Sequence, residues 1–253
     1  MGLARVIRRL RKKAEEAKAR KRRRKSLFEA LEQRLLLDTV TWDGGGDGQS
    51  WRDALNWDKD ILPAASDDVL IGGTGPAVVH SSQNNDSITS LHTSRPLTLS
   101  GGSLSIAAAS EITDGLNLAN ATLTGAGTLT FGGASTWTGG TMAGTGKTVI
   151  GSGATLEISG AGNKILDGRT IDNQGTITWT SGTLVGINGA AIVNRDGAFF
   201  DDQNPASHSL STSITGIRPQ FTIEAGAVFR KSGAGAATFQ DVIFNNAGTV
   251  LEL

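Results

Sequence analysis

Apolar positions follow two different periods along the chain, and the change falls near residue 38. Leu3, Val6, Ile7 and Leu10 recur at i, i+3, i+4 and i+7, which is the spacing of one face of an α-helix. Arg and Lys fill the other faces of that helix. Beyond residue 38, single Leu, Ile, Val and Ala residues stand between Thr and Ser, with glycines at short intervals. The pattern predicts a basic helical arm followed by a body of short β-strands.

Five glycines mark a repeat in that body. Each begins a short strand-like segment, and all intervals between them but one are equal, at about 22 residues. A longer repeat supports the period, because WTGGTMAG at 137–144 returns as WTSGTLVG at 179–186, after two steps of about 21 residues. The glycines, which we expect in turns that need a positive φ, are Gly153, Gly175, Gly197, Gly226 and Gly248.

Repeats with a period in the low twenties, made of short strands and Gly or Asn turns, are typical of a parallel β-solenoid. On a step of about 21 residues, one apolar column should contain Trp137, Ile158, Trp179 and Phe200. The segment IDNQGTI at 171–177 likewise returns as FNNAGTV at 244–250. We therefore expect an all-β chain, a right-handed parallel β-helix with a basic helical leader.

Three segments follow from these patterns. Residues 1–38 form the basic amphipathic leader, and residues 39–75 form a Trp-rich entry and capping segment. Residues 76–253 form the β-solenoid, with coils of about 22 residues. The longer interval between Gly197 and Gly226 predicts a loop insertion near 201–220, where function is to be sought first.

The balance of basic and acidic residues changes near residue 38, where the hydrophobic period also changes. Residues 1–38 hold 14 of the 24 Lys and Arg residues and 5 of the 24 Asp and Glu residues. The basic arm allows a nucleic-acid-associated tail as one alternative, but the acidic body would repel phosphates, so no nucleic-acid partner is expected. The longest pure apolar run of the leader is Leu35–Leu37, which is too short for a conventional signal peptide.

The leader resembles a known motif. FEALEQRLLL at 28–37 is similar to the LEPR-XLL leader of very large repetitive proteins, many of them from planctomycetes, although Gln33 stands where the motif has Pro. The resemblance implies export or sorting, an extracellular or cell-surface bacterial protein, and a leader that contacts the membrane or the export machinery. The matching residues are Leu31, Glu32, Arg34, Leu36 and Leu37.

The entry segment resembles the W-x-G-G…W…N-W…P…D-x-V-x-I segments that precede β-solenoids in bacterial surface proteins such as adhesins and autotransporters. The resemblance implies that large rings close the first coil and shield its edge. The matching residues are Trp42, Gly44, Gly45, Trp51, Asn56, Trp57, Pro63, Asp67, Val69 and Ile71.

Carboxylates in the entry segment raise a calcium hypothesis, because hard cations take several carboxylate oxygens. Asp43, Asp47, Asp67 and Asp68 have the spacing of neither an EF-hand loop nor a glycine–aspartate nonapeptide repeat. We interpret them as turn residues, and we expect no metal and no cofactor.

Catalytic chemistry has one candidate in the expected loop. Asp201 and Asp202 are similar to the paired carboxylates of β-helical polysaccharide hydrolases, and His208 could serve as an acid or base. The other motifs of those enzymes are absent, so we expect no enzyme. A phosphate loop at TMAGTGKTV is excluded because Thr141 stands where the motif needs Gly.

These features favour an exported structural or adhesive cell-surface protein, or the N-terminal piece of one. It would bind surface glycans or other surface proteins through its extended solenoid surface. The alternatives are a β-helical polysaccharide-degrading enzyme and a basic-tailed nucleic-acid-associated protein. Because the sequence stops inside the strand after Gly248, we also expect end-to-end self-association.

Overall fold

The computed structural model describes residues 38–81, 83–212 and 216–253. Residues Thr39–Leu253 belong to one compact unit. The helical leader and its five motif residues lie outside the described residues and remain predictions. No helix among the described residues is long and apolar enough to cross a membrane.

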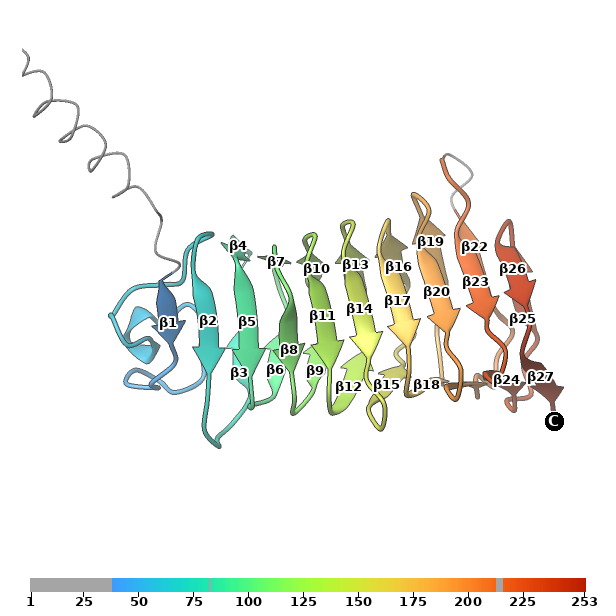
Figure 1. Cartoon of the computed structure of the whole chain (residues 1–253), viewed down its shortest axis with the longest axis horizontal. Coiled ribbons are helices and arrows are strands. Elements are labelled where there is room, and N and C mark those ends of the chain that lie inside the picture. The colour runs from blue at the N-terminus through green and yellow to red at the C-terminus, as the bar shows by residue number, and fades with distance from the viewer. Residues whose placement is uncertain (1–37, 82, 213–215) are drawn as a thin grey trace, which may run out of the picture. The chain divides into compact units, whose positions relative to one another are not determined.

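The body is an all-β parallel solenoid of about nine turns (Figure 1). Every pair of neighbouring strands within its three sheets runs parallel, and from β2 to β25 each turn contributes one strand to each sheet. In Figure 1 the strands of the ten-stranded sheet run downward on the near side while the chain advances from left to right, so the coil is right-handed. The fold class expected from the sequence is confirmed.

Sheet 1 has ten strands, in the order β1 (Thr39–Thr41), β2 (Asp68–Ile71), β5 (Ser90–Thr93), β8 (Ser110–Ile112), β11 (Thr128–Phe131), β14 (Lys147–Ile150), β17 (Thr170–Asn173), β20 (Ala191–Asn194), β23 (Gln220–Ile223) and β26 (Ile243–Asn246). Sheet 2 has nine, in the order β3 (Val78–His80), β6 (Leu97–Leu99), β9 (Leu116–Leu118), β12 (Ala134–Trp137), β15 (Thr155–Ile158), β18 (Thr176–Trp179), β21 (Phe199–Asp202), β24 (Val228–Lys231) and β27 (Thr249–Glu252). Sheet 3 has eight, in the order β4 (Asn85–Ile88), β7 (Ser103–Ile106), β10 (Thr122–Thr124), β13 (Gly140–Ala143), β16 (Lys164–Asp167), β19 (Leu184–Ile187), β22 (His208–Thr212) and β25 (Ala237–Gln240).

Coil length changes along the axis. Where β6 pairs with β9, Leu97 lies beside Leu116, which gives a coil of about 19 residues. The register of β8 with β11 gives the same short step. Where β15 pairs with β18 the step is about 21 residues, and where β21 pairs with β24 it is about 29 residues. The expected coil of about 22 residues therefore fits the step from β2 to β5 and most coils after β14, and it is too long for the coils between β3 and β14, where the turns are shorter.

The core consists of inward-facing apolar residues that alternate with outward polar ones along each strand. Trp137, Ile158 and Trp179 occupy one column, as expected. The prediction is wrong for Phe200, which pairs with Ile177 and lies outside that column. The step from β18 to β21 is longer than the constant step on which the prediction depended.

The solenoid begins earlier than residue 76. β1 and β2, inside the entry segment, are the first two strands of sheet 1. Trp42, Trp51 and Trp57 are buried there, and their rings meet edge to face with centroids 4.9 and 5.0 Å apart. The indole N–H of Trp57 donates to the carbonyl of Trp51 at 2.8 Å. A one-turn 3₁₀ helix, η1 (Ala54–Asn56), lies between these rings in sequence.

The expected loop insertion near 201–220 is not one loop. β22 lies inside this range and pairs with β19 and β25 in sheet 3. The extra length is divided between the turn at 203–207 before β22 and the connection from β22 to β23. In HSLST the buried side chains of His208 and Leu210 alternate with serines, and strand pairing on both sides stabilises the segment.

Candidate functional site

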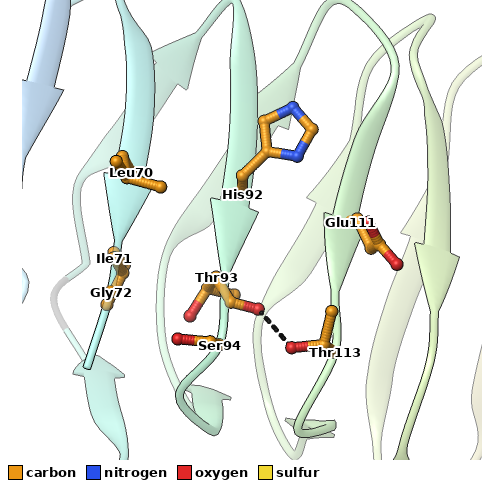
Figure 2. Close-up of a pocket in the computed structure, with 8 residues that line it drawn as sticks. All are labelled: Leu70, Ile71, Gly72, His92, Thr93, Ser94, Glu111 and Thr113. Carbon is orange, nitrogen blue, oxygen red and sulfur yellow. Dashed lines mark hydrogen bonds between the residues drawn. The ribbon is translucent and has the colours of Figure 1, made fainter. Parts of the chain in front are cut away.

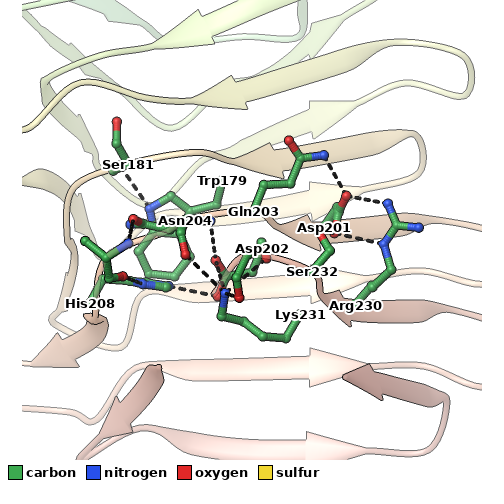
Figure 3. A network of polar contacts seen from close by, with 12 residues as sticks. Trp179, Ser181, Asp201, Asp202, Gln203, Asn204, His208, Arg230, Lys231 and Ser232 are labelled. Carbon is green, nitrogen blue, oxygen red and sulfur yellow. Dashed lines mark hydrogen bonds and ion pairs between the residues drawn. The ribbon is translucent and has the colours of Figure 1, made fainter. Parts of the chain in front are cut away.

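The two carboxylates of β21 point to opposite faces of their strand, because successive side chains on a strand alternate (Figure 3). Both are buried, with Asp201 1% and Asp202 0% exposed. Each is bound to a different set of basic partners. They therefore do not face one another as the carboxyl pair of a glycoside hydrolase does across its substrate.

Asp202 lies at the centre of a buried network. Its Oδ2 is 2.8 Å from Nε2 of His208, and its Oδ1 is 3.7 Å from Nζ of Lys231. The His208 ring meets the edge of Trp179, with centroids 4.3 Å apart. Lys231 also donates to the carbonyls of Asn204 and Gly233, at 3.2 and 2.5 Å. The network ties the turn at 203–207 to the coils on either side.

Asp201 is neutralised on the outer face. Arg230 donates to both of its carboxylate oxygens, at 3.0 and 2.5 Å. Gln203 and Ser232 donate two more hydrogen bonds, at 2.7 and 2.8 Å. Hydrogen bonds from Arg230, opposed by burial, lower the pKa of Asp201 to about 2. A carboxylate held this firmly in its charged form is a poor general acid near neutral pH.

Buried cations fill two corners of the solenoid. Lys164 is 0% exposed and donates to the carbonyls of Gly160, Gly162 and Ser181, and burial lowers its pKa. Arg169 is 1% exposed, and burial lowers its pKa to about 10. It donates to four carbonyls and one hydroxyl, those of Gly125, Gly127, Ala143, Lys147 and Thr148. These side chains satisfy turn carbonyls that the solenoid encloses.

The corner between sheets 1 and 2 has an asparagine pair instead. Asn173 donates to the side-chain oxygen of Asn194 at 2.6 Å and accepts from the backbone N–H of Gly175. Asn194 in turn donates to the carbonyl of Val228 at 2.8 Å. Both side chains are fully buried, so this chain of amides links three successive coils.

The five turn glycines all precede strands of sheet 2. Gly153, Gly197 and Gly226 have φ of +82°, +75° and +83°, which favours glycine. At the other two positions the limit is space: a Cβ on Gly175 or Gly248 would lie 2.4 Å from a backbone carbonyl oxygen.

Three of the entry-segment carboxylates, Asp43, Asp47 and Asp67, accept hydrogen bonds within their own loops, whereas Asp68 on β2 accepts from Ser90 of the next coil at 2.5 Å. Asp47 accepts from the N–H groups of Gln49 and Ser50 and from the side chain of Asn56, and bonds from Ser50 and Asn56 hold its pKa well below the usual range. The carboxylate of Asp67 accepts from the N–H of Ala64. Within the described ranges, no group of three or more His, Cys, Asp or Glu side chains could hold a metal ion.

The outer faces of sheets 1 and 3 differ in charge. On sheet 1, Leu70, His92 and Glu111 are neighbours in one row beside a shallow groove (Figure 2). On sheet 3 the first three strands carry partly or fully exposed uncharged polar side chains along two outward rows, and on the fourth strand, β13, Thr141 continues one row while Ala143 is the other outward residue. We call this set the sheet 3 polar face, and it comprises Asn85, Ser87, Ser103, Ser105, Thr122, Thr124 and Thr141.

Sequence reasoning did not find the buried basic residues or a second histidine network. His80 is 0% exposed, and its Nε2 lies 2.8 Å from Asp86, which also accepts from Arg52 at 2.5 Å. One signal was available: Lys164 and Arg169 flank a short apolar strand in a stretch with few other charges. A lone basic residue at the edge of such a strand is a candidate for burial at a corner.

No family model, curated protein or solved structure matches the chain in comparisons with known proteins. The solenoid geometry and its polar surfaces are therefore the basis for the functional argument.

Proposed function

We propose that this chain is an exported structural and adhesive surface protein whose solenoid binds glycans through the sheet 3 polar face. The observation that carries the proposal is the regular, uncharged array of hydroxyl and amide groups on β4, β7, β10 and β13. Neighbouring strands are about 4.8 Å apart, so the array repeats at that interval along the axis. Each hydroxyl can both donate and accept a hydrogen bond, which suits a polyhydroxylated partner.

Rigidity supports the same role. The buried donors at the corners connect successive coils, and the inward-facing residues form one continuous core. A rigid face presents its polar groups without an ordering cost on binding. Many weak contacts along such a face add together when the partner is a polymer with its own repeat.

The binding part of the proposal is tested with a matched pair of variants in the same coil. Thr122 and Thr124 lie on the sheet 3 polar face, and Thr128 and Thr130 lie outward on sheet 1 in an identical Thr-Leu-Thr segment. Full-length protein is sedimented with insoluble cellulose, chitin and bacterial peptidoglycan. Binding to at least one polymer should be lost in T122K/T124K and retained in T128K/T130K. Equal binding by both variants, or no binding by the wild type, would contradict the adhesive role.

Export is tested separately, because it rests on the leader. Full-length protein should be sensitive to protease added outside intact cells and should fractionate with the cell surface or the medium. Retention of the full-length protein inside cells would refute the localisation without bearing on glycan binding.

A further inference from the structure

Two buried histidines share an unusual arrangement of partners. Nδ1 of His80 lies 2.9 Å from the carbonyl oxygen of Gly101, and its Nε2 lies 2.8 Å from a carboxylate oxygen of Asp86. The ring is 0% exposed. Both ring nitrogens therefore face oxygen atoms at direct hydrogen-bonding distance.

His208 repeats the arrangement in another part of the solenoid. Its Nδ1 is 2.8 Å from the carbonyl oxygen of Ala206, and its Nε2 is 2.8 Å from Asp202. Its side chain is 3% exposed. In both cases the aspartate is six positions from the histidine in sequence, and a tryptophan ring lies against the imidazole.

The partners determine the charge of the rings. A neutral imidazole has one N–H donor and one lone pair, whereas the imidazolium has two donors. A carbonyl oxygen only accepts, and so does an ionised carboxylate. A neutral ring would therefore direct a nitrogen lone pair at an oxygen lone pair inside the protein, where such a contact is not screened by water.

Protonation of the aspartates would be the other way to supply a hydrogen, and the neighbouring cations oppose it. Arg52 donates to Asp86 at 2.5 Å, and Lys231 lies 3.7 Å from Asp202. A positive charge at these distances favours the ionised carboxylate. Trp51 lies against the His80 ring and Trp179 against the His208 ring, and neither carries a charge.

We propose that His80 and His208 are imidazolium ions in the folded protein and that each clamps neighbouring parts of the chain together through both ring nitrogens. The His80 clamp joins three pieces: β3, which carries it; Asp86 of β4, which also holds Arg52 of the entry segment; and the turn after β6, through Gly101. The His208 clamp fixes the turn at 203–207 against β21. This device is independent of the proposed glycan binding.

Removal of either ring should loosen the parts that it joins. Without His80, the entry segment with its three tryptophans would lose an attachment to β4 and to the turn after β6. Without His208, the turn at 203–207 would lose its attachment to β21.

The ¹⁵N chemical shifts of the imidazole nitrogens in full-length wild-type protein test the charge state directly. At about pH 7 both buried rings should show two protonated nitrogens, as their two acceptor partners require. The pattern of a neutral tautomer in either ring of the folded protein would overturn the proposal for that clamp. Because this measurement uses the wild type, it does not depend on any variant folding.

Thermal unfolding of variants tests the consequence. H80Q and H208Q should each lower the melting temperature, because Gln cannot bind the carbonyl and the carboxylate together as the charged ring does. H92Q is the matched control, because His92 is exposed on sheet 1, and it should keep the wild-type melting temperature. Equal melting temperatures for the wild type and the two clamp variants would refute the clamps.

Discussion

Replacing Arg169 with Met should destabilise the solenoid far more than removing an exposed arginine. The guanidinium makes five hydrogen bonds of 2.8 to 3.3 Å that bridge turns from three coils. Met has a similar length and no donor, so the substitution leaves four enclosed carbonyls without this partner. Each buried group left unpaired costs about 1–3 kcal/mol.

Two effects reduce the total cost of leaving these four carbonyls unpaired. Burial lowers the pKa of Arg169 from its ordinary value to about 10, which corresponds to about 3 kcal/mol of desolvation that the variant avoids. Water that enters the vacated corner would satisfy some of the carbonyls. We therefore expect a net loss of about 2–5 kcal/mol in the free energy of unfolding, in the range measured when one partner of a buried ionic contact is removed.

Urea denaturation followed by circular dichroism measures this loss. R218M is the control, because Arg218 is 57% exposed and its ion pair with Asp241 is at 3.8 Å, so its loss should cost less than about 1 kcal/mol. The midpoint in urea should move strongly for R169M and little for R218M. Equal midpoints for the two variants would show that the corner carbonyls are satisfied without the guanidinium, and the buried-cation argument would then be wrong.

Three further predictions concern other parts of the chain. Because its folded pKa is depressed to about 2, the Asp201 carboxylate should contribute about 2 kcal/mol above pH 4 and lose it as the pH falls toward 2; R230Q should remove most of this acid-dependent step in thermal melts. G125A should lower the melting temperature far more than G153A, since both have positive φ but a Cβ on Gly125 would lie 2.1 Å from a backbone oxygen, whereas Gly153 has open space; equal effects would contradict the packing argument. Deleting residues 1–37 should retain the protein inside cells while leaving the melting temperature nearly unchanged, and a large fall would show that the leader is part of the core.

The fold could be predicted because several repeat signals agreed. The glycine spacing, the duplicated WTGGTMAG segment and the apolar column from Trp137 to Trp179 all come from the C-terminal coils, where large residues make the repeat visible. The shorter N-terminal coils could not be predicted because their repeat consists of short segments with two Leu residues and no aromatic residue. Examples are Leu97–Leu99 and Leu116–Leu118. Phe200 was misplaced because a constant step was extended across a longer coil.

The polar networks could not be predicted from local patterns. The partners of Arg169 include carbonyls 42 and 44 residues earlier in the chain, and a backbone carbonyl has no sequence signature. The sequence did identify Asp201, Asp202 and His208 as chemically notable. It could not show that strand alternation sends the two carboxylates to opposite faces, because the coil boundaries at 201–220 were not yet known.

The buried polar side chains at the corners differ from coil to coil, and this difference bears on misfolding. A chain of similar strands can pair one coil out of place during folding, which is a common route to aggregates of repetitive proteins. Here such a slip would separate Asn173 from Asn194, or would leave Lys164 and Asp202 enclosed without their partners. These residues therefore destabilise stacks in which a coil is out of register, and they favour the native order of the coils.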